Sequence, residues 1–311
     1  MACEDELRLV DRVVISDDGS SDDTVKLAVH CWTSATPLEI LTSPSNFGEY
    51  INVNSAVMGL GSETKWYLLM HSDNLAKRGW IRTLVTEARS APDSVGSVCT
   101  SYDFRKLNGE IILGENGTER IRMIPASKGS INDTLQNGCW WHNSTAAVRV
   151  AAFRDIGGMP AEQGLSQMGD WDFSLRLLAN GWDIAYVPKA LIIYCDNTFS
   201  VSSTNFITHR DVLDRAKVTE NFCDGAPVDL LNRCYSQMYR TLFRRLASSL
   251  VRGHGRRFFA AIVALGKVMR SHLYCLKHRS ETREPRRFPV RFEKKTVLRP
   301  RALSPRRTHQ I

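Results

Sequence analysis

Apolar strand-like runs alternate with amphipathic helix-like runs over about the first 190 residues, and this order is the feature that most restricts the fold. The clearest strand-like runs are RVVIS (12–16), LEILTSP (38–44), KWYLLMHSDN (65–74) and VGSVCTSYDF (95–104). Helix-like runs lie between them, including one with Tyr50, Val53, Val57 and Leu60 on one face. Such alternation predicts a layered α/β fold built on a mixed, mostly parallel sheet.

Polar residues follow two of these strands at the points where the apolar runs stop. Asp17 and Asp18 come after residues 12–16, and His71 and Asp73 come after the run that ends at Met70. In open α/β sheets ligands bind beyond the carboxyl ends of the strands, so we expect both groups at one rim of the sheet. The acidic turn could instead end a strand and cap a helix, and that reading stays open.

The spacing His-x-Asp allows His71 and Asp73 to face the same ion. Mg²⁺ and Mn²⁺ prefer carboxylate oxygens and use phosphate oxygens to complete their coordination. Imidazole suits Mn²⁺ better than Mg²⁺, so His71 could bind the metal directly, through water, or not at all.

Two further segments carry candidate site residues. Asp170 and Asp172 open the helix-like run GDWDF, where acids either stabilise the helix N-terminus or provide a general base for an acceptor hydroxyl. The segment CWWHN places Trp140, Trp141 and His142 between the metal and base segments. Aromatic rings there could support a sugar acceptor, or simply fill the core.

Taken together, the order and spacing of these motifs resemble the family-2 inverting glycosyltransferases of the GT-A fold. The segments that carry the resemblance are VVISDDGSSDDT, N46-F-G with Asn54 eight residues on, the run ending HSDN, FRDIGGM and GDWDFSLRLLANGWDIAYVP. The resemblance covers about residues 10–190. It implies transfer of a sugar from a nucleotide-diphospho-sugar to a hydroxyl of a glycan or lipid-linked acceptor, with inversion and with Mg²⁺ or Mn²⁺ as cofactor.

The resemblance also implies roles for single residues. Asp17 and Asp18, together with Asn46 and Asn54, would bind the nucleotide. Asp73 would hold the metal that bridges the diphosphate, with His71 at the position of the family's first acid. Asp170 would be the catalytic base.

Three departures from the family pattern stand beside these roles. His71 replaces the first metal-binding acid, and Gly169 replaces the Glu that usually precedes the base. The strand and helix that usually come before the Asp-Asp strand are absent, which would leave unpaired strand edges. The alternative is therefore a non-catalytic sugar-nucleotide or glycan-binding relative, truncated at the N-terminus. A glycoside hydrolase fits the strand-end Asp-Asp-Gly-Ser less well.

Charge is divided unevenly along the chain. From Arg240 onward, 20 basic and 3 acidic residues give +17, which leaves 21 basic and 30 acidic residues, or −9, for the rest. We expect a glycosyltransferase domain at 1–222, a basic amphipathic helical extension at 223–278 and a disordered Arg/Pro-rich tail at 279–311. The basic segment favours an anionic membrane surface, and a plain solvated tail is the alternative. Nucleic-acid binding is favoured less, because no known motif for it is visible.

Location follows from what the sequence lacks. The polar N-terminus does not look like a signal peptide, and no run of 18 apolar residues predicts a membrane span. The eight cysteines form no CxxC pair and are expected to be reduced. We therefore expect a cytoplasmic protein, peripheral at the inner face of the cytoplasmic membrane, that serves cell-surface polysaccharide or glycolipid synthesis.

Overall fold

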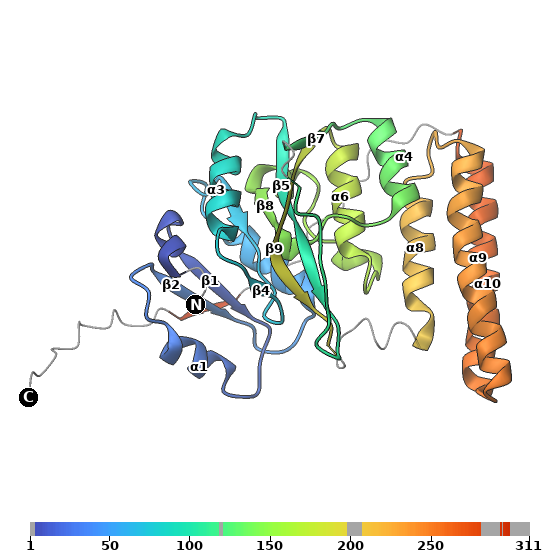
Figure 1. The fold of residues 1–311 in the computed structure, drawn as a ribbon, viewed down its shortest axis with the longest axis horizontal. Coiled ribbons are helices and arrows are strands. Elements are labelled where there is room, and N and C mark those ends of the chain that lie inside the picture. The colour runs from blue at the N-terminus through green and yellow to red at the C-terminus, as the bar shows by residue number, and fades with distance from the viewer. Residues whose placement is uncertain (1–3, 118–120, 198–206, 281–292, 294, 299–311) are drawn as a thin grey trace, which may run out of the picture.

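The computed structural model describes residues 4–117, 121–197, 207–280, 293 and 295–298. It shows a mixed α/β body with a helical extension at one end (Figure 1). This architecture confirms the predicted fold class, including its C-terminal helices.

A small sheet holds the N-terminal strands. β1 (Val13–Asp17) runs parallel to β2 (Leu38–Thr42), and α1 (Thr24–Cys31) connects them. The other edge of β2 pairs antiparallel with β10 (Thr296–Leu298), from near the C-terminus. Disorder was predicted for residues 279–311, and that prediction is wrong for Thr296–Leu298. Most of the remaining tail lies outside the described residues.

The larger sheet has the order β3-β8-β5-β9-β4, with β6 paired to β5 and β7 paired to β9. Its strands are β3 (Trp66–Leu68), β4 (Leu75–Ala76), β5 (Val95–Arg105), β6 (Ile111–Ile112), β7 (Arg122–Ile124), β8 (Ala146–Arg149) and β9 (Asp183–Cys195). Only β5 and β9 pair in parallel here. The prediction of mostly parallel pairing is therefore wrong for the described strands. Several short strands return antiparallel onto the edges, which apolar runs alone do not reveal.

Two hydrophobic clusters hold the body together. On one face, α3 (Trp80–Ser90) buries Trp80, Ile81 and Leu84 against the large sheet. The short helix η1 (Glu4–Leu9) supports α3. The Glu6 carboxylate accepts hydrogen bonds from the amides of Gly79 and Arg82, which lie at the N-terminus of α3. The other cluster collects residues of α2 (Glu49–Met58), α4 (Lys128–Asn137), α5 (Val150–Asp155) and α6 (Gly169–Ala179).

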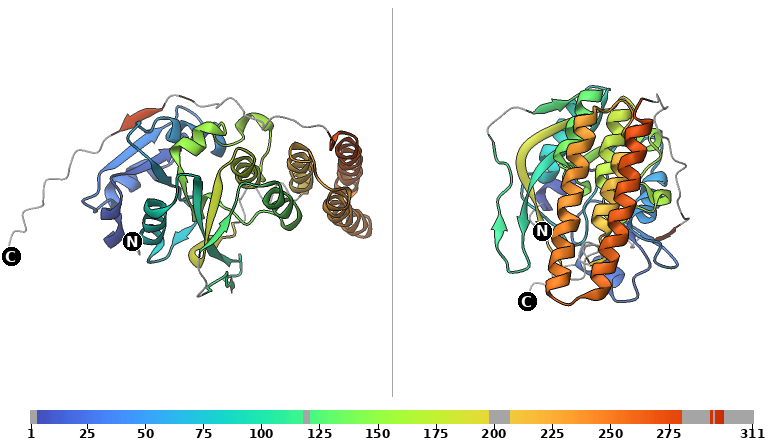
Figure 2. Two further views of the ribbon diagram at one scale, coloured as in Figure 1. Left: turned by 90° about the horizontal axis from the view of Figure 1, so that it is seen from above. Right: turned by 90° about the vertical axis from the view of Figure 1, so that its right-hand side faces the viewer.

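The extension consists of α8 (Arg210–Asn221) and a hairpin of two long helices, α9 (Val228–Val251) and α10 (Gly255–His278), seen in both views of Figure 2. Tyr235 of α9 is buried and hydrogen-bonds Ser271 of α10 at 2.7 Å. Although the sequence has no uninterrupted apolar run, α10 is long and apolar enough to cross a membrane by length and composition alone.

The two sheets do not join through a common strand. Among the described strands, β1 has a partner only in β2, and β3 has a partner only in β8. The strand before Asp17 and the strand before His71 therefore belong to separate sheets, although both were expected at the rim of one.

Candidate active site

The turn after β1 uses the first of its two acids to hold its own backbone. The Asp17 carboxylate is buried and accepts hydrogen bonds from the amides of Gly19 and Ser20, both at 3.2 Å. Gly19 has φ +77°, and a β-carbon there would overlap the backbone of Ser45. In this state the Asp17 side chain therefore shapes the turn.

Asp18 connects this turn to the start of α2. Its carboxylate accepts hydrogen bonds from the amides of Phe47 at 3.1 Å and Gly48 at 2.8 Å. Exposed Asn46 also accepts from the amide of Gly48, at 3.1 Å. The structure thus brings Asp18 and Asn46 together beside the N-terminus of α2, as the nucleotide-site hypothesis requires.

His71 lies against an acid that the sequence analysis did not single out. Its Nε2 is 3.3 Å from a carboxylate oxygen of Glu49, the first residue of α2. Burial alone would lower the pKa of the His71 imidazole, but Glu49, with Asp170 and Asp73 farther off, raises that pKa to about 8. An imidazolium offers no lone pair to a metal, so this pairing favours Asp73 over His71 as a metal ligand.

The side chain of Asp73 is exposed in the segment that follows β3, so of the two predicted metal ligands it is the one open to a metal. No three His, Cys, Asp or Glu side chains gather into a metal cluster within the part of the chain that the structure describes. Mg²⁺ is commonly bound through one or two carboxylates plus substrate phosphates rather than by an all-protein cage. The residues present fit that mode of binding.

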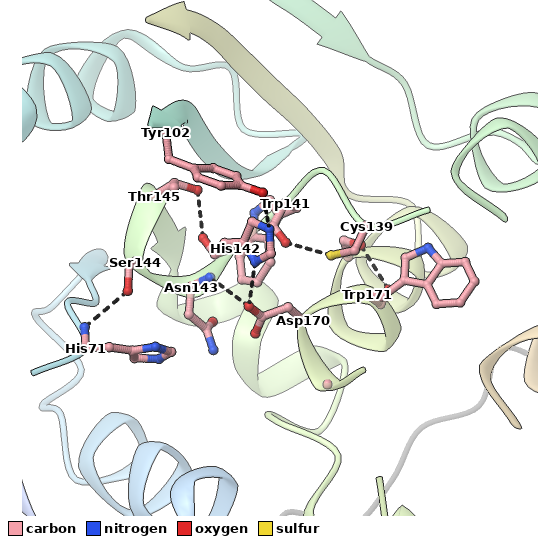
Figure 3. Close-up of polar contacts among 12 residues, drawn as sticks. His71, Tyr102, Cys139, Trp141, His142, Asn143, Ser144, Thr145, Asp170 and Trp171 are labelled. Atoms are coloured by element: carbon pink, nitrogen blue, oxygen red, sulfur yellow. Dashed lines mark hydrogen bonds and ion pairs between the residues drawn. The ribbon is translucent and has the colours of Figure 1, made fainter. Parts of the chain in front are cut away.

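Asp170 lies in the first turn of α6 and is held through one oxygen. Its Oδ2 is 3.3 Å from Nδ1 of His142 and accepts a hydrogen bond from the amide of Asn143 at 3.3 Å (Figure 3). Its Oδ1 has no hydrogen bond or ion pair among the residues described. An acid in the first turn also interacts favourably with the helix dipole, so Asp170 fits its position at the N-terminus of α6.

The orientation of His142 follows from its second neighbour. Nε2 of His142 is 3.2 Å from the hydroxyl of Tyr102, and burial raises the pKa of that hydroxyl. The tyrosine therefore keeps its proton at neutral pH and can donate a hydrogen bond to Nε2 of His142. In the tautomer that matches this bond, Nδ1 carries the imidazole proton and donates to Asp170.

Tyr50 explains why glycine precedes Asp170. The Tyr50 hydroxyl accepts a hydrogen bond from the amide of Gly169 at 3.0 Å, and a β-carbon at residue 169 would overlap its ring. Burial raises the pKa of the Tyr50 hydroxyl, which keeps it neutral. The space that the family's Glu would need is therefore filled by an aromatic side chain.

Several of the predicted site residues lie elsewhere. Asn54 is fully buried, and its side-chain amide bonds both the carbonyl and the amide of Met159, so its prediction as a nucleotide ligand is wrong for this state. Trp141 is also fully buried, stacked on Phe173 and bonded to Ser97, so it is a core residue and not an acceptor platform. Trp140 instead lines a surface pocket of about 300 Å³ beside α4.

The remaining candidates converge. Ser144 bonds both the amide of His71, at 3.2 Å, and the side chain of Asn74, at 2.9 Å, which fastens the segment around Asp73 to the one that carries His142. Figure 3 shows the ring of His71 on the side of Asn143 and Asp170. Glu49 and Tyr102 were missed in the sequence, because only the placement of α2 and β5 brings them here.

Comparisons with known proteins agree with these motifs. Residues 4–156 match the model of glycosyl transferase family 2. The succinoglycan biosynthesis protein ExoA of Rhizobium meliloti (strain 1021) is 25% identical over 185 residues, covering 59% of this chain and 53% of that protein. The chain thus spans about half the length of this curated relative. The crystal structure of GalNAc-T7 with UDP, GalNAc and Mn²⁺ aligns over 68% of this chain and 41% of its own, with 13% identity and a TM-score of 0.46, too low to support an inference.

Proposed function

Since its motifs and the match over residues 4–156 place this chain in glycosyl transferase family 2, with the GT-A class of fold, we propose that it transfers a sugar from a nucleotide-diphospho-sugar to an acceptor hydroxyl with inversion. The observation that carries the proposal is the position of Asp170: partly exposed, free at Oδ1, and close to the segments of Asp73 and His71. The similarity to a succinoglycan biosynthesis protein favours polysaccharide synthesis as its role.

In this proposal each group has one task. Asp18 and Asn46 hold the nucleotide at the end of β1, with Asp17 fixing the turn. Asp170 takes the proton of the acceptor hydroxyl as that oxygen attacks the anomeric carbon, and the nucleoside diphosphate leaves with the bonding electron pair. His142 and Tyr102 orient Asp170. A bound Mg²⁺ or Mn²⁺, held by Asp73, would stabilise the charge on the departing diphosphate.

A thermal-shift screen tests nucleotide and metal binding directly. UDP, GDP, CDP and dTDP are each added with Mn²⁺ or Mg²⁺, and at least one should raise the Tm of the wild type, because a ligand that binds only the native state stabilises it. Asp73→Ala should lose the metal-dependent part of that Tm shift. Without ligand, its Tm should equal that of the wild type. Asp93→Ala, an exposed acid at the opposite end of β5, is the control. If no nucleotide stabilises the wild type, the proposal fails.

The alternative is a binding protein without transferase activity, and His71 in place of a metal-binding acid favours it. The two functions differ in one measurable outcome. A binding protein would be stabilised by a nucleotide-sugar but would not release nucleoside diphosphate from it. Neither transfer of the sugar to an acceptor nor slow hydrolysis by water would be observed.

The helical hairpin of α9 and α10 offers a surface for the predicted binding to an anionic membrane. Exposed apolar side chains lie along α9 and α10, among them Leu250, Val251 and Phe259. Exposed arginines accompany them, including Arg252 and Arg256. Interfacial helices combine such apolar groups with basic residues, each basic residue contributing about 1 kcal/mol near an anionic surface.

A flotation assay tests this surface. The full-length protein should float with vesicles that contain phosphatidylserine, and less so as salt is added. Leu250→Glu combined with Phe259→Glu should abolish flotation. Leu113→Glu, an equally exposed leucine beside β6, should leave it unchanged. Equal flotation of the double variant and the wild type would contradict the proposal.

A further inference from the structure

The C-terminal part of the chain returns to the candidate nucleotide site. β10 pairs with β2 in the register Thr296 to Thr42, Val297 to Leu41 and Leu298 to Ile40. Just before it, the amide of Glu293 donates a hydrogen bond to Ser55 of α2 at 2.9 Å. Both views place β10 beside β1 and β2, at the opposite end of the molecule from α9 and α10 (Figures 1 and 2). We name Glu293 and residues 295–298 the strap.

Lys295 of the strap inserts its ammonium group between β1 and α2. Nζ donates hydrogen bonds to Oγ of Ser16 at 2.7 Å, to the carbonyl oxygen of Asp17 at 3.1 Å, and to Oδ1 of Asn52. Asn52 in turn donates to the carbonyl of Ser16 at 3.0 Å. These bonds fix the carboxyl end of β1 to α2, next to the turn that holds Asp17 and Asp18.

The three oxygens that Lys295 contacts are neutral, and no ion pair of Lys295 occurs among the residues that the structure describes. Burial lowers the pKa of its ammonium group, while Asp18 and Asp17 nearby raise it. The strap thereby brings a cation from the basic end of the chain to the most acidic turn of the acidic body. An anionic nucleotide at this turn would meet the carboxylates of Asp17, Asp18, Asp22 and Asp23, and the nearby Lys26 is already paired with Asp23.

We propose that Lys295 is a residue of the donor site, delivered by the strap: it positions Asp17 and Asp18 and supplies positive charge for the nucleoside diphosphate. This inference rests on the proposed function, since it names a further residue of the same site. The groups that interact with Lys295 are Ser16, Asp17, Asp18 and Asn52 and do not include Asp170 among the described residues, so we expect its effect on donor affinity and not on proton transfer.

The test is calorimetric titration of UDP, GDP, CDP and dTDP with Mn²⁺ into the full-length protein and two variants. Lys295→Gln keeps a hydrogen-bonding side chain but removes the charge, and should weaken binding of the preferred nucleotide about tenfold. Lys295→Arg keeps the charge and should restore most of the affinity. Lys267→Gln, an exposed lysine of α10, is the matched control and should bind like the wild type.

Two readouts separate charge from a merely structural role. Affinity of the wild type should fall more steeply with salt than affinity of Lys295→Gln, because one charged contact is missing in the variant. In turnover assays Lys295→Gln should raise the KM for the donor with kcat within about twofold, as expected for loss of uniform binding.

The outcomes distinguish this inference from the proposed function. If the wild type binds no nucleotide, the proposed function fails and takes the role of Lys295 with it. If the wild type binds and Lys295→Gln binds equally well with the same salt dependence, only the role of Lys295 is overturned. If Lys295→Gln does not fold, the result for Lys295→Arg decides. Lys295→Arg is expected to fold and to bind the preferred nucleotide with a Kd within a few-fold of the wild type. A folded Lys295→Arg that does not bind the nucleotide would contradict the charge argument.

Discussion

Asp170→Asn is expected to lower kcat for sugar transfer by about 10³-fold while leaving nucleotide affinity unchanged. A positioned general base contributes about 10² to 10⁴ in rate, and an amide cannot accept the proton. The substitution keeps the size of the side chain. The amide of Asn143 and Nδ1 of His142 can still donate to the remaining carbonyl oxygen. The loss therefore reports on proton transfer and not on altered geometry.

The measurement is release of nucleoside diphosphate from the nucleotide-sugar that stabilises the wild type, with membrane-derived glycan as acceptor. Asp93→Asn, an exposed acid near the start of β5, is the matched control and should turn over normally. A variant at Asp170 that kept more than a tenth of wild-type kcat would show that another group takes the proton. A fall in nucleotide affinity of the same size would assign Asp170 to binding instead.

The sequence predicted the elements that depend on long, regular patterns. Alternating apolar runs located β1, β2, α2, β5 and α6, and the acids after β1 and β3 indicated two segments of the candidate site. β10 was missed because three residues in an Arg- and Pro-rich tail carry no periodic signal, and their pairing partner lies more than 250 residues earlier. Lys295 could not be identified as a site residue without it.

Errors at the site arose where spacing does not determine which way a side chain points. Neighbouring residues in CWWHN face three surroundings: Trp140 a surface pocket, Trp141 the core and His142 the carboxylate of Asp170. Asn54 lies on the helix expected to hold the nucleotide, but its amide bonds the backbone of Met159. The partners that decide these roles come from distant elements.

The two acids of GDWDF, Asp170 and Asp172, lie two residues apart in the sequence but face opposite surroundings. Asp172 is fully buried, and its Oδ2 is 2.6 Å from Nε of Arg176, one helical turn later. Arg176 also donates to the carbonyl of Ile156 at 2.7 Å, and Gln163 donates to the same Asp172 oxygen at 3.3 Å. This cluster ties α6 to the turn after α5.

Asp172→Asn should therefore lower the free energy of unfolding by about 3–5 kcal/mol, since it leaves the Arg176 guanidinium buried without its counter-charge. Urea unfolding followed by circular dichroism measures the change. Asp170→Asn, two residues away and partly exposed, should stay within about 1 kcal/mol of the wild type.

The double variant Asp172→Leu with Arg176→Met separates the two causes of this loss. Replacing a buried ion pair by apolar side chains of similar volume is often neutral or stabilising, so the double variant should recover most of the stability that the single variant loses. If it is as unstable as Asp172→Asn, the double variant has lost as much stability with the bonds to Ile156 and Gln163 as it regained by removing the uncompensated charge. If Asp172→Asn has the same free energy of unfolding as the wild type, the Asp172–Arg176 pair contributes nothing to stability. The packing of Trp171, Phe173 and Leu175 would then hold α6 in place.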